Sequence, residues 1–503
     1  MQALIAPLNE LAEFEELYKN RTKESGMIRV CGCVNSQKTH MMYALGDGLK
    51  YKVIACSSEL KAKQIYEEYH FLDSQTYLYP AKDLLFYQAD LRSKELLRQR
   101  MEVLQALEEE KPMTVVTSFD AFLDSLAPKE VIGERFLHIR NDSALDLGEM
   151  QKRLIELGYD REVQIESFGQ FAIRGGILDV YPLTEELPVR IEMWGDEVDS
   201  IRTFDVETQR SIENLTEISI CPAVEFPQDG ERRVSFLDYF PVDETILFLD
   251  EPVRLREKGE GVEAEFMEAQ KKRVENGCEM TEGEVLLFGT EEILRKMNAY
   301  SSIGFFALDM RCKVLETRGS LSLQAKTVNP YNSSFDMLTR DLKRLKRNGY
   351  RVVLLSGSRT RAKRLAEDLR DYNLSSFYSD DLNREAAPGE IMTAYGHVAT
   401  GYEYPMIKYT VISETDIFGK VKKKKKRKLY EGRRIQEFSE LKPGDYVVHE
   451  NHGLGIYQGI EKIEVDKISK DYMKISYAKG GNLYIPATQL DLIQLFLAAI
   501  ALS

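Results

Sequence analysis

The sequence is poor in cysteine and contains no long apolar run. Six cysteines in 503 residues are too few for the disulfide framework of a small secreted domain. Cys31 and Cys33 form a C-x-C pair, but no second Cys or His pair completes a zinc site, so we expect no bound metal. The sequence also lacks a run of about 18 apolar residues and a signal peptide. These absences exclude secreted and membrane-spanning classes and predict a cytoplasmic protein.

An excess of basic charge is absent as well. The 82 acidic residues outnumber the 68 basic ones, and a net charge of −14 will not draw the whole chain to nucleic acid. The strongly basic segment 422–428 reads K-K-K-K-K-R-K, and its adjacent cations repel one another and favour an extended linker. Contact with DNA phosphates is the other interpretation of this segment, and the two are compatible.

A phosphate-binding loop is nearly complete close to the N-terminus. Residues 32–39 read G-C-V-N-S-Q-K-T, where a working loop reads G-x-x-x-x-G-K-[ST]. Gly32, Lys38 and Thr39 match this pattern, but Gln37 replaces the glycine that lets the backbone approach the phosphates. A glutamine brings a Cβ atom and a polar side chain into that space. We therefore predict a degenerate site that binds no nucleotide, and no cofactor for this chain.

Strands and helices alternate over residues 1–120, as in a parallel sheet with helices on both faces. An apolar strand at 245–249 ends in Asp250 and Glu251, the form of a Walker B site that would hold Mg²⁺. Residues 208–325 are therefore interpreted as the same nucleotide fold, resuming after an insert. The expected strands of the first half are 27–33, 52–56, 76–79 and 114–117, and the expected helices are 36–48, 59–71 and 93–109.

The length predicts several domains, and the remaining segments differ in pattern from the nucleotide fold. Residues 121–207 contain short strands bounded by Gly, Pro and Asp, which predicts an α+β insert. Residues 335–418 predict a separate small α/β domain, which a basic linker at 419–438 joins to a Tudor- or SH3-like β-barrel at 439–495. The predicted class is thus an α/β multidomain protein. The expected strands of the insert are 136–139, 164–166, 171–174, 176–181, 189–194 and 197–204.

Two long segments resemble known families. Residues 169–182 read G-Q-F-A-I-R-G-G-I-L-D-V-Y-P and residues 188–205 read P-V-R-I-E-M-W-G-D-E-V-D-S-I-R-T-F-D, similar to the module shared by UvrB and the Mfd family of transcription-repair coupling factors. Residues 441–460 and 484–493 resemble the RNA polymerase-interacting domain of the same family, which is related to CarD. In this order the two modules resemble the coupling factors rather than UvrB, which implies a bacterial protein of transcription-coupled nucleotide excision repair.

The resemblance implies that the insert binds UvrA. Arg174, Arg190 and Trp194 occupy positions of the family motif and are the UvrA-binding residues that the resemblance implies. Trp194 replaces an aromatic residue that is commonly phenylalanine in the family. Arginine and large aromatic residues dominate interface hot spots. The structural alternative is that Trp194 lies in the core and the two arginines are solvated.

The resemblance also implies that the C-terminal domain binds the β subunit of RNA polymerase by strand addition. An exposed strand edge offers unpaired N–H and C=O groups for such pairing. Tyr457, Ile460 and Ile463 are the anchor residues that the resemblance suggests.

The family carries two motor domains, whereas this sequence has no second phosphate-binding loop and no D-E-x-[HQ] motif, and 495–503 departs from the family pattern. We therefore expect no DNA translocation and no ATP hydrolysis, with ATP and Mg²⁺ belonging only to the family's motor. The expected function is that of an adaptor between stalled RNA polymerase and UvrA. Two alternatives stay open: a UvrB-like ATPase that uses Lys38, Thr39, Asp250 and Glu251, and a CarD-like transcription regulator.

Overall fold

Two compact units make up the chain in the computed structural model. The first comprises residues 1–82, 92–264 and 283–420, and the second comprises 83–91, 265–282 and 421–503. The structure describes residues 2–82, 94–224, 232–275, 287–309, 313–419, 432–434, 443–449, 453–465, 468–476, 482–486 and 493–496. The basic segment 422–428 lies outside these residues. None of the helices that the structure describes is long and apolar enough to cross a membrane.

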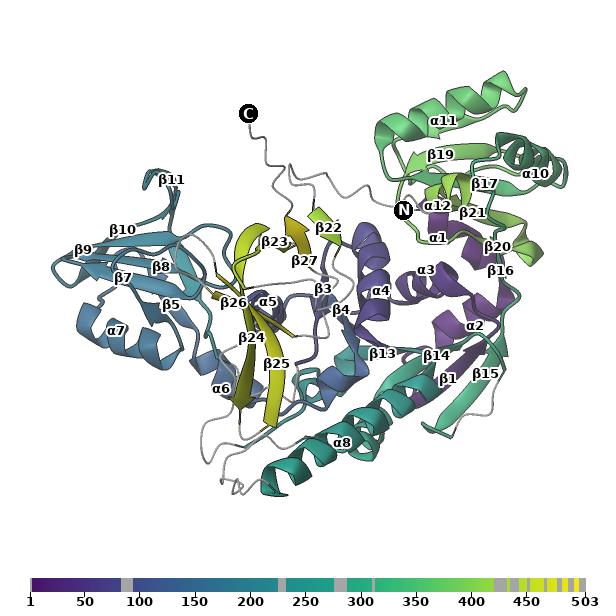
Figure 1. Ribbon diagram of the computed structural model, residues 1–503. Coiled ribbons are helices and arrows are strands. Elements are labelled where there is room, and N and C mark those ends of the chain that lie inside the picture. Colours follow the sequence, from purple (N-terminus) through teal and green to yellow (C-terminus); the bar gives the residue numbers. More distant parts are fainter. Residues whose placement is uncertain are drawn as a thin grey trace. The chain divides into compact units, whose positions relative to one another are not determined.

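A seven-stranded parallel sheet is the central element of the first unit (Figure 1), with the strand order β15-β1-β14-β13-β2-β4-β3. β13 pairs with β2 on one side and with β14 on the other, so strands from before and after the insert share one sheet. This confirms the predicted α/β fold with a parallel sheet. The strands are β1 (Gly26–Cys31), β2 (Tyr51–Cys56), β3 (Thr76–Tyr79), β4 (Met113–Ser118), β13 (Thr245–Asp250), β14 (Ser301–Phe306) and β15 (Thr317–Ser322).

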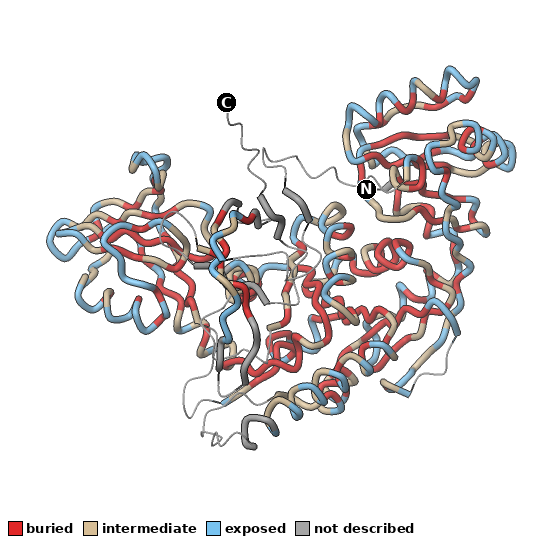
Figure 2. Tube along the Cα trace, in the orientation of Figure 1, coloured by how far each residue is buried: buried red, intermediate tan, exposed pale blue. Residues whose placement is uncertain are grey.

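Helices cover both faces of this sheet, which explains why β4 and β13 are buried along their whole length, as Figure 2 shows. Successive strand residues point to opposite faces. Ile54 therefore packs with Met41 and Ile65 on one face, while Val53 packs with Leu104 on the other. The first face carries α2 (Ala12–Asn20), α3 (Asn35–Leu45) and α4 (Glu59–Leu72), and the second carries α5 (Lys94–Glu108) and α9 (Thr290–Met297).

The insert contains two sheets of its own. One pairs β5 (Leu137–Arg140) with β12 (Glu217–Ile220), and the other has the order β11-β10-β9-β8-β7-β6. The insert therefore continues to Ile220, beyond the expected boundary at 207. The larger sheet consists of β6 (Asp160–Arg161), β7 (Gln170–Arg174), β8 (Ile177–Tyr181), β9 (Val189–Trp194), β10 (Glu197–Phe204) and β11 (Ser211–Leu215), and α7 (Leu147–Glu156) precedes it.

The strand predicted at 164–166 is wrong, because a side chain takes up the backbone donors there. Gln170 Oε1 accepts hydrogen bonds from the N–H groups of Glu166 (2.8 Å) and Ser167 (3.0 Å), so the segment bends instead of pairing. The first strand of this sheet is instead β6, which pairs with β7 in parallel.

The small α/β domain has a six-stranded sheet in the order β16-β20-β21-β17-β19-β18. On one face, Leu354 packs with Leu342 of α10 (Phe335–Arg347) and Leu369 of α11 (Arg359–Asp371). The strands are β16 (Lys326–Thr327), β17 (Arg351–Ser356), β18 (Phe377–Ser379), β19 (Ile391–Tyr395), β20 (Tyr402–Tyr404) and β21 (Tyr409–Ser413), and α12 (Glu414–Phe418) follows them.

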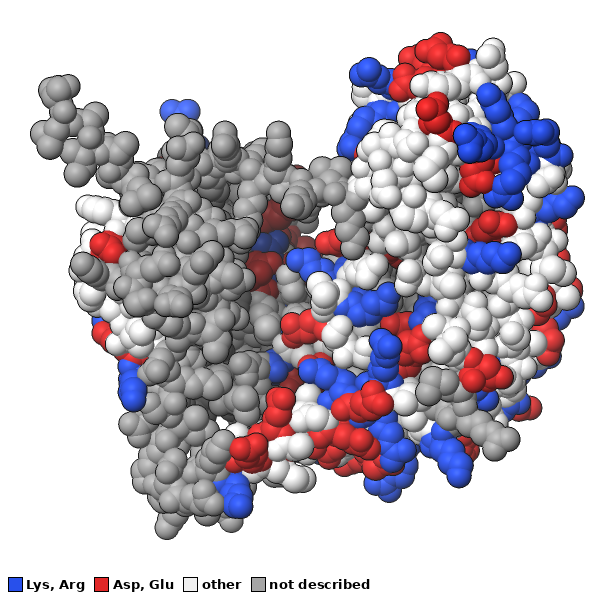
Figure 3. All heavy atoms as spheres, turned by 45° about the vertical axis from the view of Figure 1, so that its right-hand side comes forward, with Lys and Arg blue, Asp and Glu red and all other residues white. Residues whose placement is uncertain are grey.

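The other face of this small sheet is covered by the nucleotide fold. Val353 and Leu355 belong to the same buried cluster as Met41 of α3 and Leu4 of α1 (Gln2–Ile5). The domain expected to be separate therefore shares a hydrophobic core with the first sheet. Lysine, arginine and acidic residues are interspersed on the face of the molecule that Figure 3 presents.

His40 lies in this shared core. Its Nε2 atom donates a hydrogen bond to the Leu4 carbonyl oxygen (2.7 Å), so its Nδ1 atom accepts one from the Tyr404 hydroxyl (3.0 Å). Its ring stacks on Tyr402 with the centroids 5.0 Å apart. Burial lowers the pKa of His40 to about 4, so the imidazole is neutral at pH 7.

Polar bonds reinforce the same interface beside His40. The Ser36 hydroxyl donates to Glu68 Oε1 (2.6 Å) and accepts from the Thr400 N–H group (3.1 Å). The same Glu68 oxygen accepts from the Ala399 N–H group (2.9 Å). Helix α3 is thus fixed to the 399–404 segment by both apolar and polar contacts.

The described strands of the second unit form a six-stranded antiparallel sheet with the order β22-β27-β23-β24-β25-β26. The predicted Tudor- or SH3-like barrel stays a prediction. The strands are β22 (Gly432–Arg434), β23 (Tyr446–His449), β24 (Gly453–Val465), β25 (Ile468–Ser476), β26 (Asn482–Pro486) and β27 (Ile493–Phe496).

We expect acid to destabilise the first unit through His40. The pKa of His40 falls from 6.5 to about 4 on folding, so only the unfolded chain takes up this proton as the pH drops between those values. The free energy of unfolding should therefore decrease through this window, by roughly 3 kcal/mol from this group. In denaturant titrations at several pH values, His40→Gln should remove that part of the decrease. The control variant His138→Gln, at an exposed position of β5, should keep the full decrease. Identical pH profiles for His40→Gln and the parent would contradict the assignment of this decrease to His40.

Candidate functional site

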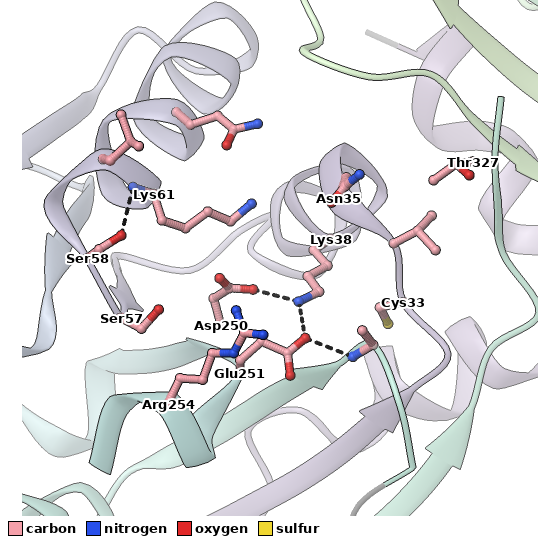
Figure 4. A pocket seen from close by; sticks show the side chains of 14 residues that line it. Cys33, Asn35, Lys38, Ser57, Ser58, Lys61, Asp250, Glu251, Arg254 and Thr327 are labelled. Atoms are coloured by element: carbon pink, nitrogen blue, oxygen red, sulfur yellow. Dashed lines mark hydrogen bonds and ion pairs between the residues drawn. The ribbon is translucent and has the colours of Figure 1, made fainter. Parts of the chain in front are cut away.

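A pocket of about 500 Å³ opens where β1, β2, β13 and β14 end (Figure 4). Ligands of open α/β sheets bind at this carboxyl edge of the strands. The pocket is lined by Cys33, Val34, Asn35, Lys38, Ser57, Ser58, Leu60, Lys61, Gln64, Asp250, Glu251, Arg254, Ala307 and Thr327.

Lys38 is bound to the two Walker B carboxylates. Its Nζ atom lies 2.7 Å from Asp250 Oδ1 and 2.7 Å from Glu251 Oε1. The side chains are 6%, 4% and 20% exposed, respectively. Burial disfavours the charge of Lys38, but Asp250 and Glu251 outweigh burial and raise the pKa of Lys38 above its ordinary value. The lysine that would bind phosphate is therefore paired with the acids that would hold Mg²⁺, and the three groups together keep one negative charge.

Glu251 connects this ion pair to the neighbouring strand. Its Oε1 atom also accepts a hydrogen bond from the Ala307 N–H group (2.8 Å), and its own N–H group donates to the Phe305 carbonyl (3.0 Å). The backbone of Glu251 is left-handed, with a φ of 53°, which a residue other than glycine adopts only when its surroundings hold it. The ion pair thus joins α3 to the ends of β13 and β14.

The degenerate loop is short, because α3 begins within the motif at Asn35. Only Cys33 and Val34 separate this helix from Gly32. Gly32 has a φ of 79°, and a Cβ atom there would lie 2.2 Å from the Leu323 carbonyl oxygen. The glycine is therefore required by the packing of the chain itself, and the loop has too few residues to surround a phosphate group.

The predicted role of Gln37 as an obstruction of the phosphate space is wrong. Its side chain is buried, its Oε1 atom accepts from the Val34 N–H group (3.1 Å), and it does not line the pocket. Thr39 lines a different, smaller cavity together with Ser36 and His40. Residues 35 and 38 share one face of α3, whereas 37 and 39 lie on others. The structure brings Lys38 together with the two acids and leaves Gly32, Gln37 and Thr39 outside the pocket.

The two arginines of the predicted UvrA surface share one buried carboxylate. Arg190 Nε and Nη2 donate to the two oxygens of Asp179 at 2.6 and 2.9 Å, and Arg174 Nη2 donates to Oδ2 at 2.6 Å. Arg190 also donates to Gln209 (2.9 Å) and lies 4.4 Å from the centre of the Phe204 ring. Asp179 is 1% exposed, so the arginines are paired rather than solvated. Asp179 belongs to none of the predicted sites, although an aspartate inside an apolar strand is a sign of such a pair.

Trp194 is exposed instead of being part of the core. It ends β9 beside a turn at Gly195, and 82% of its surface is accessible. A tryptophan is seldom left in water, so the exposure is informative. The structure therefore excludes the core interpretation for this residue.

The predicted polymerase-binding strand has one open edge. β23 pairs with residues 453–456 of β24 and β25 pairs with 456–465, so from 458 onward no strand among those described covers the other edge. Tyr457 is buried, Ile460 is 46% exposed, and the side chain of Ile463 lies outside the described residues. Ile460 is thus the predicted anchor that the structure leaves accessible in this unit.

Residues 137–226 match the UvrB interaction domain family, and residues 441–497 match the CarD-like/TRCF RID domain family. The transcription-repair-coupling factor of Bacillus subtilis is 30% identical over 488 residues, an alignment that covers 85% of this chain and 41% of the relative. Those of Staphylococcus haemolyticus and of Staphylococcus aureus strain MRSA252 are each 27% identical with the same coverage. The chain is thus similar to the transcription-repair-coupling factors.

The chain spans about two fifths of the length of these coupling factors. The UvrB interaction domain covers the insert from β5 to β12, and the RID domain covers β23 to β27. The residues on which the resemblance to this family rests fall within these two matches. The pocket with Lys38 lies outside both of them.

Removing the charge of Lys38 should destabilise the fold. Lys38→Met leaves two carboxylates unpaired and should lower the free energy of unfolding by about 3–5 kcal/mol in denaturant titrations. Adding Asp250→Asn and Glu251→Gln to that variant should restore most of the loss. Lys63→Met, on the exposed side of α4, is the matched control and should change little. Parent-like stability of Lys38→Met would show that the ion pair does not support the fold.

Proposed function

We propose that this chain is the adaptor part of a transcription-repair coupling system and links stalled RNA polymerase to UvrA. The presence of a UvrB interaction domain and a polymerase-interacting domain of the coupling-factor type on one chain carries the proposal. An adaptor needs two binding surfaces and no chemistry of its own. The nucleotide fold then serves as the platform on which the insert is mounted.

We propose further that the platform does not hydrolyse ATP and needs no cofactor. To use Lys38 for phosphate and Asp250 for Mg²⁺, a nucleotide would have to break two short bonds between largely buried charges. This cost disfavours the UvrB-like ATPase as an alternative. The CarD-like regulator is disfavoured because it gives the matched UvrB interaction domain no role.

On the repair side, we assign binding to Trp194 and a positioning role to Arg190. Large aromatic side chains that lose their exposure on binding contribute most to interfaces. Arg190 is 15% exposed and holds Asp179, so its contribution is to fix β8 against β9 beneath the surface. Arg174, at 47% exposure, combines this ion pair with access to a partner.

On the transcription side, we propose strand addition to the open edge of β24 by the β subunit of RNA polymerase. Main-chain hydrogen bonds would supply affinity there, and Ile460 would supply an apolar contact. The basic segment 422–428, which precedes this domain, is a candidate for a DNA contact because phosphate attracts clustered lysines.

Trp194→Ala should weaken binding to purified UvrA by 2 kcal/mol or more, roughly 30-fold, in calorimetry without nucleotide or DNA. Ile155→Ala removes another exposed apolar side chain of the insert, on α7, and should leave the affinity unchanged. Arg190→Ala should instead lower the thermal stability of the insert, because it leaves Asp179 with one partner fewer. Full affinity in the Trp194 variant would remove this residue from the interface.

Ile460→Asp should abolish capture of RNA polymerase by the immobilised chain, because a charge would enter the apolar contact beside the added strand. The same variant should bind UvrA normally, and Trp194→Ala should bind polymerase normally. This reciprocal pattern in pull-downs distinguishes loss of a surface from loss of the fold. Polymerase binding by Ile460→Asp at parental affinity would reject the β24 edge.

A further inference from the structure

The pocket has charged lining residues besides the Lys38 ion pair. Lys61 reaches into it from α4, and Arg254 enters from α8 (Pro252–Glu275), as Figure 4 shows. Within the described part of the chain, neither side chain makes a hydrogen bond or an ion pair. Two cations thus face the same cavity, and neither forms an ion pair with the Asp250 and Glu251 carboxylates that also line it.

Donors of a second kind accompany these cations. The hydroxyl groups of Ser57, Ser58 and Thr327 and the amide groups of Asn35 and Gln64 line the cavity. Ser58 Oγ accepts a hydrogen bond from the Lys61 N–H group (3.3 Å), which leaves its hydrogen available to a ligand. The lining therefore offers several donors to an anion with many oxygens.

The local charge differs in sign from that of the whole chain. Lys38, Lys61 and Arg254 oppose Asp250 and Glu251, so the pocket carries one net positive charge, whereas the chain carries −14. The two carboxylates are engaged by Lys38 and would repel an anion from that end. An anionic ligand would therefore lie toward Lys61 and Arg254.

We propose that this pocket binds a small phosphate-bearing molecule through Lys61 and Arg254, without Mg²⁺ and without the degenerate loop. Its volume of about 500 Å³ is typical of small-molecule sites. Arginine and lysine together suit phosphate, since the guanidinium group pairs with two oxygens and the ammonium group acts as a point charge. The Walker residues take no part in binding, because Lys38 is bonded to both carboxylates. The site is independent of the adaptor role, and its failure would leave that role intact.

Calorimetry with pyrophosphate tests this site in the full chain. In the presence of a chelator, pyrophosphate should bind with a dissociation constant of about 1 mM or lower. Lys61→Ala and Arg254→Ala should each weaken binding about tenfold. Lys63→Ala, an exposed lysine of the same helix outside the pocket, should have no effect.

Three results would overturn the proposal. The first is no binding of pyrophosphate by the parent chain at about ten times the expected dissociation constant. The second is binding that requires Mg²⁺ and survives both alanine substitutions. The third is equal affinity for malonate, a dianion without tetrahedral phosphate groups, which would make the site a general anion patch. Unchanged thermal unfolding of the two variants establishes that any lost binding comes from the pocket.

Discussion

The ion pair between Lys38 and the carboxylates at the end of β13 is the interaction on which the nucleotide fold depends. It joins α3, the helix that follows β1, to strands that follow the insert, and all three side chains are largely withdrawn from water. In a nucleotide hydrolase the same residue types bind the ligand: the lysine binds phosphate and the acids hold Mg²⁺. Here each group already has a partner within the chain, so the fold needs no nucleotide to hold these side chains in place.

The second constraint is the position of α3 between two sheets. Its residues Met41 and His40 pack into the core that the small α/β domain completes, and the Ser36 hydroxyl accepts a hydrogen bond from the Thr400 N–H group. Gln37 fits this arrangement, since a buried side chain that caps its own helix replaces the flexible glycine of a working loop. The loss of the glycine is therefore connected with a gain in packing.

The sequence predicts much of the architecture because periodicity and strand ends carry it. The parallel sheet and the small α/β sheet follow from apolar spacing, and the resumption of the nucleotide fold at β13 follows from the acidic pair at the end of that apolar strand. The directions in which the Gln37 and Thr39 side chains point cannot be predicted in this way. They depend on the residue at which α3 begins, and a shift of one residue turns a helix by about 100°. Lys61 and Arg254 belong to no sequence motif, so their proximity could not be predicted. It follows from the tertiary structure, which places α4 and α8 at the same cavity.

The strand order of the first sheet has a consequence for synthesis of the protein. β1 lies between β14 and β15, and Ser301 follows its partner Gly26 by about 275 residues. At translation rates of about 5–20 residues per second, β1 waits roughly 15–60 s on the ribosome with both edges unpaired. Such an apolar strand is exposed to aggregation during this interval, and long-range parallel pairing is slow even afterwards. The chain is therefore expected to depend on a chaperone to reach its native sheet.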